Sequence, residues 1–165
     1  MTKNILIVED EASIRDALGK VLQNEKYEVF SAENGREAVE KFKMKKMDLV
    51  VLDLGLPVKD GWQTIQWLTR VNPHLPVIII TGRCNQRESA EKMGAQVLME
   101  KPLDVPSLLQ LIRELIEVPM ESRKMQPFGF RHVSGARELV LTSLTECCNT
   151  PPTILGGRSR DWQGG

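Results

Sequence analysis

The chain alternates between short apolar runs and longer amphipathic segments. Five runs have the length and composition of β-strands, at residues 4–8, 27–32, 48–52, 77–80 and 96–99. Helices are predicted in five further segments. Apolar residues recur at helical spacing at residues 12–24, 35–46, 62–71 and 104–117, whereas residues 86–92 are polar and are followed by Gly94, a good C-terminal stop. The pattern therefore predicts five strands and five helices in alternation.

Two of the strand runs, residues 5–8 and 77–80, are apolar at every position. Such runs suit strands that are covered on both faces, and each gap between strands is long enough for a crossover helix. The prediction is an α/β fold with a doubly wound parallel sheet and helices on both faces. In these sheets ligands bind at the carboxyl ends of the strands, near the point where strand order switches.

Polar side chains gather at those predicted strand ends. They are Glu9 and Asp10 after the first strand, Asp53 after the third, Thr81 after the fourth, and Glu100 with Lys101 after the fifth. Three carboxylates at one edge of a sheet repel one another unless a cation lies between them. The cluster therefore predicts a hard divalent ion with oxygen ligands, and Mg²⁺ fits best.

Asp53 stands where a carboxylate could attack a phosphoryl group. A metal ion and the Lys101 ammonium would neutralise charge on the phosphoryl oxygens, which makes Asp53 a candidate phosphorylation site. The Thr81 hydroxyl could donate a hydrogen bond to the bound phosphoryl group and move when it arrives.

Four short motifs carry a resemblance to a known family: VEDE at residues 8–11, DLGLPVKDG at 53–61, TG at 81–82 and EKP at 100–102. Together, and in this order, they resemble the receiver domain of two-component response regulators, over about residues 3–118. The resemblance implies a flavodoxin-like fold, with the five strands in the order 2-1-3-4-5.

The resemblance also implies a role for each residue of the cluster. Asp53 would accept phosphate from a phosphohistidine of a sensor histidine kinase or a histidine phosphotransfer protein. Asp10, Asp53 and the backbone carbonyl of Gly55 would bind Mg²⁺ directly, and Glu9 would bind it through a water molecule.

Three further positions follow from the same resemblance. Lys101 would pair with the phosphoryl group, Thr81 would be the switch hydroxyl, and the peptide bond before Pro102 would be cis. Leu98 departs from the family pattern, since many receivers have Tyr or Phe there. Output is expected through protein contact, as a homodimer or with a downstream protein, at the face formed by the fourth helix, fifth strand and fifth helix.

Two alternatives stay open. A phosphatase of the haloacid-dehalogenase type also uses an aspartate nucleophile after an apolar strand, but it has a second aspartate where this chain has Gly55. A degenerate receiver would take no phosphate and act as a constitutive interaction module. The receiver interpretation implies a chain that promotes its own phosphorylation and dephosphorylation but is not a turnover enzyme.

Composition and charge limit the other classes of function. The chain has 165 residues, a formal net charge of zero and no apolar stretch long enough for a bilayer span, so a soluble protein without a membrane partner is expected. No targeting segment is visible. The three cysteines have no disulfide or zinc spacing, which favours the cytoplasm.

The composition changes after Val118, which predicts a receiver domain at residues 1–118 and a linker or tail at 119–165. The tail holds four prolines and six glycines, so it is expected to be mostly disordered, with one short helix at 134–148. It has 6 basic and 4 acidic residues, and its few apolar groups cannot build a winged-helix domain. These features argue against direct DNA binding.

Overall fold

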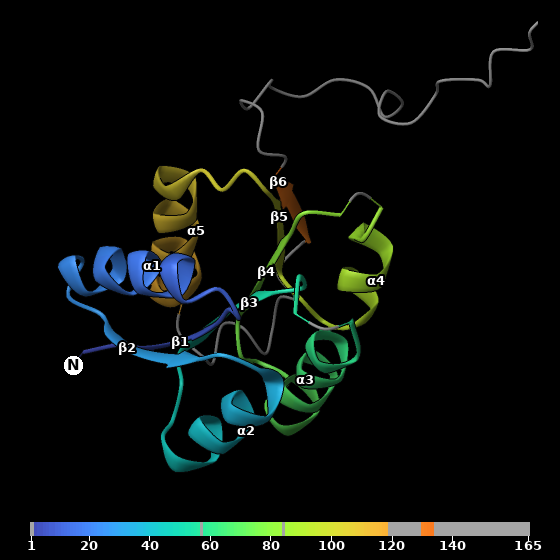
Figure 1. Ribbon diagram of the computed structural model, residues 1–165, viewed down its shortest axis with the longest axis horizontal. Helices are drawn as coiled ribbons and strands as arrows, with labels where there is room; N and C mark the ends of the chain where they lie inside the picture. Colours follow the sequence, from blue (N-terminus) through green and yellow to red (C-terminus); the bar gives the residue numbers. More distant parts are fainter. Residues whose placement is uncertain (1, 57, 84, 119–129, 134–165) are drawn as a thin grey trace, which may run out of the picture.

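Strands and helices alternate along the chain in the computed structural model, which describes residues 2–56, 58–83, 85–118 and 130–133 (Figure 1). The strands are β1 (Asn4–Val8), β2 (Glu28–Ala32), β3 (Leu49–Asp53), β4 (Val77–Thr81), β5 (Val97–Glu100) and β6 (Arg131–Val133). The helices are α1 (Ala12–Asn24), α2 (Gly35–Met44), α3 (Val58–Val71), α4 (Arg87–Lys92) and α5 (Val105–Glu117).

The strands form one parallel sheet in the order β2-β1-β3-β4-β5-β6. The predicted α/β class and the order 2-1-3-4-5 are confirmed for the first five strands. The structure adds β6 at the outer edge of β5, which the apolar pattern did not predict. The predicted helix at 134–148 lies outside the described residues.

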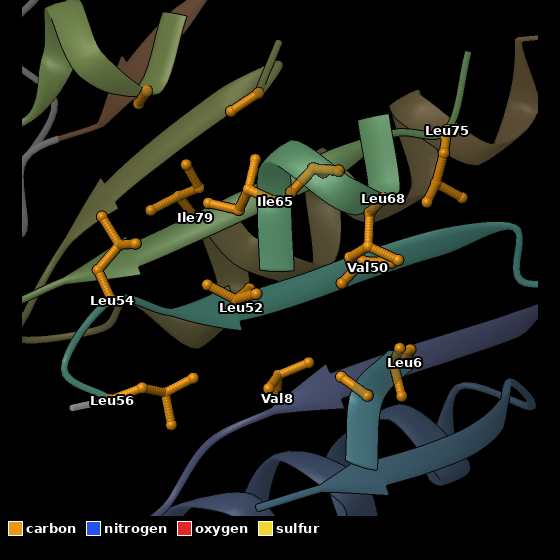
Figure 2. Packing of buried hydrophobic residues seen from close by; sticks show 14 of the residues in the cluster. Leu6, Val8, Val50, Leu52, Leu54, Leu56, Ile65, Leu68, Leu75 and Ile79 are labelled. Atoms are coloured by element: carbon orange, nitrogen blue, oxygen red, sulfur yellow. The ribbon is translucent and has the colours of Figure 1, made fainter. Parts of the chain in front are cut away.

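Helices cover both faces of the sheet. Successive residues of each strand point to opposite faces, so each strand contributes side chains to both layers. Val50 and Leu52 of β3 pack toward α2 and α3, in the layer whose buried side chains are shown in Figure 2. Leu49 and Val51 face the other way, into the layer that holds the apolar stripes of α1 and α5. Central strands buried on both faces explain why their sequences are apolar throughout.

Two helix boundaries differ from those predicted by more than one residue. The helix α2 ends at Met44, two residues early, because Lys45 has an extended backbone (φ −143°, ψ 143°). The helix α3 begins at Val58, four residues early. Its first turn contains Lys59, Asp60 and Gly61, which show no apolar periodicity. Within the described residues, every helix is too short or too polar to span a lipid bilayer.

Candidate functional site

The sheet brings the polar strand ends predicted from the sequence to one edge. Val8 of β1 lies beside Leu52 of β3. The next residues along the two strands, Glu9 and Asp53, therefore lie at the same edge of the sheet. In the neighbouring pair of strands, Thr81 of β4 lies beside Glu100 of β5. Because all these strands are parallel, their carboxyl ends point the same way, and the groups that follow them form one cluster.

Lys101 and Asp53 form the centre of this cluster. The Lys101 ammonium donates to Asp53 Oδ2 at 2.6 Å and lies 3.5 Å from Glu9 Oε2. The Asp53 carboxylate is almost completely buried, whereas about a third of the lysine side chain is exposed. The backbone N–H of Gly55 donates to Asp53 Oδ1 at 2.7 Å. The carboxylate is therefore fixed in orientation by one ammonium and one amide.

Three carboxylates of the cluster are arranged as a cation site requires. One oxygen each from Glu9, Asp10 and Asp53 lies within 4.8 Å of the others. Glu9 Oε2 is buried and accepts no hydrogen bond from the described residues. A buried carboxylate oxygen that, in the described part of the chain, accepts no hydrogen bond and has only the Lys101 ammonium at 3.5 Å, beside two other carboxylates, belongs to the donor set that a hard divalent cation prefers. The residues present therefore fit a Mg²⁺ ion.

Burial and the negative charge of Asp53 together raise the pKa of Glu9 from its ordinary value of 4.5 to about 7, with burial the larger cause, although the charge of Lys101 acts in the opposite direction. For Lys101, burial alone would lower the pKa. The hydrogen bond to Asp53 and the charges of Asp53 and Glu9 outweigh burial, so the pKa of Lys101 is raised. The ammonium is thus charged at neutral pH.

The raised pKa of Glu9 predicts that the Mg²⁺-free protein loses stability as pH rises from about 4.5 to 7. Over that range the folded state binds more protons than the unfolded state, so the free energy of unfolding falls with pH. The fall is at most about 3.5 kcal/mol, since the pKa shift from 4.5 to about 7 is about 2.5 units and one unit corresponds to about 1.4 kcal/mol. Urea unfolding across this range with a chelator checks it. The same series for Glu9→Gln should be flatter, and an equal slope in both proteins would contradict the assignment.

Arg15 is a part of the site that the sequence analysis missed. Its guanidinium donates to the backbone carbonyls of Glu9 and Asp10, at 2.8 and 3.2 Å. These bonds fix the loop that carries both acids, since neither carbonyl is used in the β1 ladder. The spacing offered a signal, because Arg15 falls in the first turn of α1, five residues after Asp10.

Thr81 is buried at the end of β4, and its hydroxyl accepts a hydrogen bond from the backbone N–H of Arg83 at 3.0 Å. The backbone N–H of Lys101 donates to the Thr81 carbonyl at 2.8 Å, which ties the loop after β5 to β4. The peptide bond between Lys101 and Pro102 is cis. The hydroxyl therefore lies beside the cluster without a bond to Asp53.

Leu98 lies in β5 between Ile79 of β4 and His132 of β6, and only 1% of it is exposed. It packs in the layer that faces α2, α3 and α4. A leucine in this place fills the core and presents no polar group at the surface.

Leu98→Ala is expected to lower the free energy of unfolding by about 2–5 kcal/mol, because it leaves a cavity in a packed layer. Urea unfolding measures the loss. Val71→Ala is a suitable control, since Val71 is half exposed at the end of α3. A loss at Leu98 as small as that of the control would show that the β5 layer is loosely packed.

The fold and the cluster together define a doubly wound α/β domain with carboxylates and a lysine at its ligand-binding edge. A family model for the response regulator receiver domain matches residues 5–113. The chain belongs to this family, whose members are modules of two-component signal transduction and generally bind Mg²⁺.

Two curated relatives show how the match extends along the chain. The sporulation initiation phosphotransferase F of Bacillus subtilis is 30% identical over 124 residues, covering 74% of this chain and 98% of that protein. The transcriptional regulatory protein ZraR of Klebsiella oxytoca is 31% identical over 160 residues, covering 92% of this chain and 36% of that protein. The chain thus spans nearly all of one relative and about a third of the other.

Solved receiver structures are similar to this chain in both sequence and fold, and one of them is bound to Mg²⁺. The response regulator protein TrrA from Thermotoga maritima in complex with Mg²⁺ and BeF is 32% identical, with a TM-score of 0.64. The match covers 69% of this chain and 99% of that chain. The likeness agrees with the sheet order and the helix layers described above.

Proposed function

We propose that the chain accepts a phosphoryl group on Asp53 from the phosphohistidine of a sensor histidine kinase or a histidine phosphotransfer protein. The observation that carries the proposal is the Asp53 carboxylate itself. It is buried among two other acids, yet it is held 2.6 Å from the Lys101 ammonium at the ligand-binding edge of the sheet. A buried carboxylate that serves only structure does not need such a cluster.

The proposed reaction forms a bond between an Asp53 carboxylate oxygen and phosphorus and breaks the bond between phosphorus and the donor's imidazole nitrogen. The imidazole leaves with the electron pair of that bond and takes up a proton. Lys101 neutralises charge on the phosphoryl oxygens during transfer and afterwards pairs with the product. Gly55 has no side chain to hinder approach, since a Cβ there would lie 2.9 Å from Asp53 Oδ2.

The residues that would hold Mg²⁺ are Asp10, Asp53 and the Gly55 backbone carbonyl directly, with Glu9 acting through a water molecule. When bound, Mg²⁺ supplies positive charge to the phosphoryl oxygens and relieves the repulsion among the three acids. Arg15 supports this arrangement through the two carbonyls that it binds.

The response to the phosphoryl group is proposed to begin at Thr81. Its hydroxyl would leave the Arg83 amide and donate to a phosphoryl oxygen, while Lys101 stays paired with the phosphoryl group. Leu98 replaces the aromatic residue that the family resemblance implied for this step, so the signal would have to pass through the β4 and β5 backbones.

The remaining assignments of the proposal concern partners and place. Output would pass through protein contact on the face of α4, β5 and α5, either to a downstream protein or to a second copy. The reaction is proposed to occur in the cytoplasm, without a membrane partner and without direct DNA contact. The chain would promote its own phosphorylation and dephosphorylation and would not be a turnover enzyme. Residues 1–118 would form the receiver domain, and residues 119–165 would form its linker or tail.

The test is incubation of the full chain with radiolabelled acetyl phosphate, with Mg²⁺ or with a chelator. The proposal expects a covalent label that depends on Mg²⁺ and is lost rapidly in base, as an acyl phosphate is. If no label forms at any Mg²⁺ concentration, the chain is a degenerate receiver that acts as a constitutive interaction module.

A further inference from the structure

The outer edge of β5 is occupied by a strand from the chain's own C-terminal region. Residues 131–133 form β6, which runs parallel to β5 with Arg131 beside Val97 and Val133 beside Met99. The backbone N–H of Arg131 donates to the Gln96 carbonyl at 2.9 Å. In Figure 1, β6 lies at the end of the sheet, between α4 and α5. The strand therefore covers backbone groups of β5 that would otherwise form an open edge.

Side chains of this segment contact both helices that flank the edge. The Arg131 guanidinium pairs with Glu114 of α5 at 2.5 Å. His132 Nε2 lies 3.0 Å from Glu100 Oε1. On the other face of the sheet, the Arg87 guanidinium of α4 lies 6.0 Å from the centre of the Phe130 ring. The edge thus suits an extended segment with an aromatic residue followed by two basic ones.

The attachment is short and only partly buried, with Phe130 and Val133 packed against the two hydrophobic layers of the core. The strand has three residues, and both partners of its ion pair to α5 are about 40% exposed, so the pair contributes little. Its connections to β5 lie at one end of the sheet, where unfolding of a short segment leaves the five-stranded core intact. A strand of this kind can leave its edge without unfolding the domain.

The same edge is joined to the phosphorylation site through adjacent residues. Glu100, which holds His132, precedes Lys101, which holds Asp53. Glu100 also lies beside Thr81 in the sheet, and the Lys101 amide donates to the Thr81 carbonyl. Movement of Thr81 and Lys101 toward a phosphoryl group would therefore shift the end of β5 to which His132 of β6 is attached.

We propose that the edge of β5 is a strand-docking surface for the chain's own residues 130–133, and that a phosphoryl group on Asp53 releases this strand. The inference rests on the proposed function of Asp53. It supplies a route by which the state of Asp53 changes the surface between α4 and α5 although position 98 is a leucine. By thermodynamic reciprocity, a docked β6 opposes binding of the phosphoryl group.

The first test measures amide hydrogen exchange of the full chain with Mg²⁺ alone and with Mg²⁺ plus beryllofluoride, a mimic of the phosphoryl group. Exchange in the peptide that contains residues 130–133 is expected to accelerate at least about fivefold, the lower end of typical coupling between sites. The fluorine NMR signal of bound beryllofluoride, measured on the same sample, reports whether the site is filled.

The two readouts separate the two ideas. Bound beryllofluoride with unchanged or slower exchange at 130–133 overturns the release of β6 and leaves the proposed function of Asp53 standing. The absence of a bound fluorine signal overturns both, because the release requires a filled site.

The second test runs the coupling in reverse. Arg131→Pro removes the backbone bond to Gln96 and the ion pair to Glu114, and Arg131→Glu places a second acid beside Glu114. Both are expected to bind beryllofluoride at least about fivefold more tightly than the unmodified chain. Arg113→Ala is the matched control. It removes another ion pair of α5, between Arg113 and Glu25, which has the same N–O distance of 2.5 Å and does not involve β6. Equal affinity in all four proteins would refute the coupling.

Discussion

Replacing Asp53 with asparagine is expected to abolish phosphoryl acceptance from any donor. An amide has no anionic oxygen to attack phosphorus, and Glu9 and Asp10 follow β1 rather than β3, so neither occupies the position where Gly55 and Lys101 hold the acceptor. The measurement is covalent label per chain after incubation with Mg²⁺ and acetyl phosphate. Label should fall to background in Asp53→Asn.

Asp48→Asn is the matched control, because Asp48 precedes the same strand at its opposite end, where its carboxylate accepts a hydrogen bond from the backbone N–H of Asn4 at 2.9 Å. The control should take up label as the unmodified chain does. Label in Asp53→Asn at the level of the control would mean that another residue is the acceptor.

Replacing Lys101 with methionine is expected to slow phosphorylation of Asp53 by about a hundredfold or more, in line with the loss of one preorganised group that stabilises developing charge. Methionine keeps most of the volume of the side chain and removes the ammonium that lies 2.6 Å from Asp53 Oδ2. The rate constant at saturating donor and Mg²⁺ measures the effect, and Lys101→Arg should recover part of it by restoring the charge.

Lys92→Met provides the control for a lost lysine charge, since Lys92 pairs only with Glu88 on the exposed face of α4 among the described residues. Its rate should match that of the unmodified chain. A Lys101→Met protein that is phosphorylated as fast as the control would remove Lys101 from the reaction and leave it a purely structural partner of the buried acids.

The elements and the acidic cluster could be predicted from the sequence because each depends on a strong local signal. An apolar run that ends in an acid identifies a buried strand and its carboxyl end together, as β3 does at Asp53. Parallel strands then place those ends side by side without any knowledge of register. The meeting of Glu9, Asp53 and Lys101 follows from topology alone.

The parts that escaped prediction depend on contacts between distant segments. The role of Arg15 requires knowing that its side chain turns back toward two carbonyls of the preceding loop. The strand β6 has three residues with a mixed polar pattern in a region of glycine and proline, so its pairing partner, not its own sequence, makes it a strand. The first turn of α3 was not predicted because its residues show no apolar spacing.

The position of β6 beside β5 bears on how the domain would signal. Leu98 is buried between β4 and β6, whereas Glu100, two residues further along β5, contacts His132 of β6. A movement of Thr81 and Lys101 therefore acts first on the adjacent end of β5, because α4 and α5 begin several residues further along the chain. The proposed release of β6 follows the proposed phosphorylation of Asp53. Phosphorylation can therefore be tested independently of the release.

The most direct measurement is the location of the phosphoryl group. The full chain is incubated with Mg²⁺ and acetyl phosphate, reduced with borohydride, which converts an aspartyl phosphate to homoserine, and digested for peptide mass spectrometry. Homoserine is expected at position 53 and at no other aspartate, and only when Mg²⁺ is present. An unreduced Asp53 beside homoserine elsewhere, or no homoserine in the chain, would contradict the central claim.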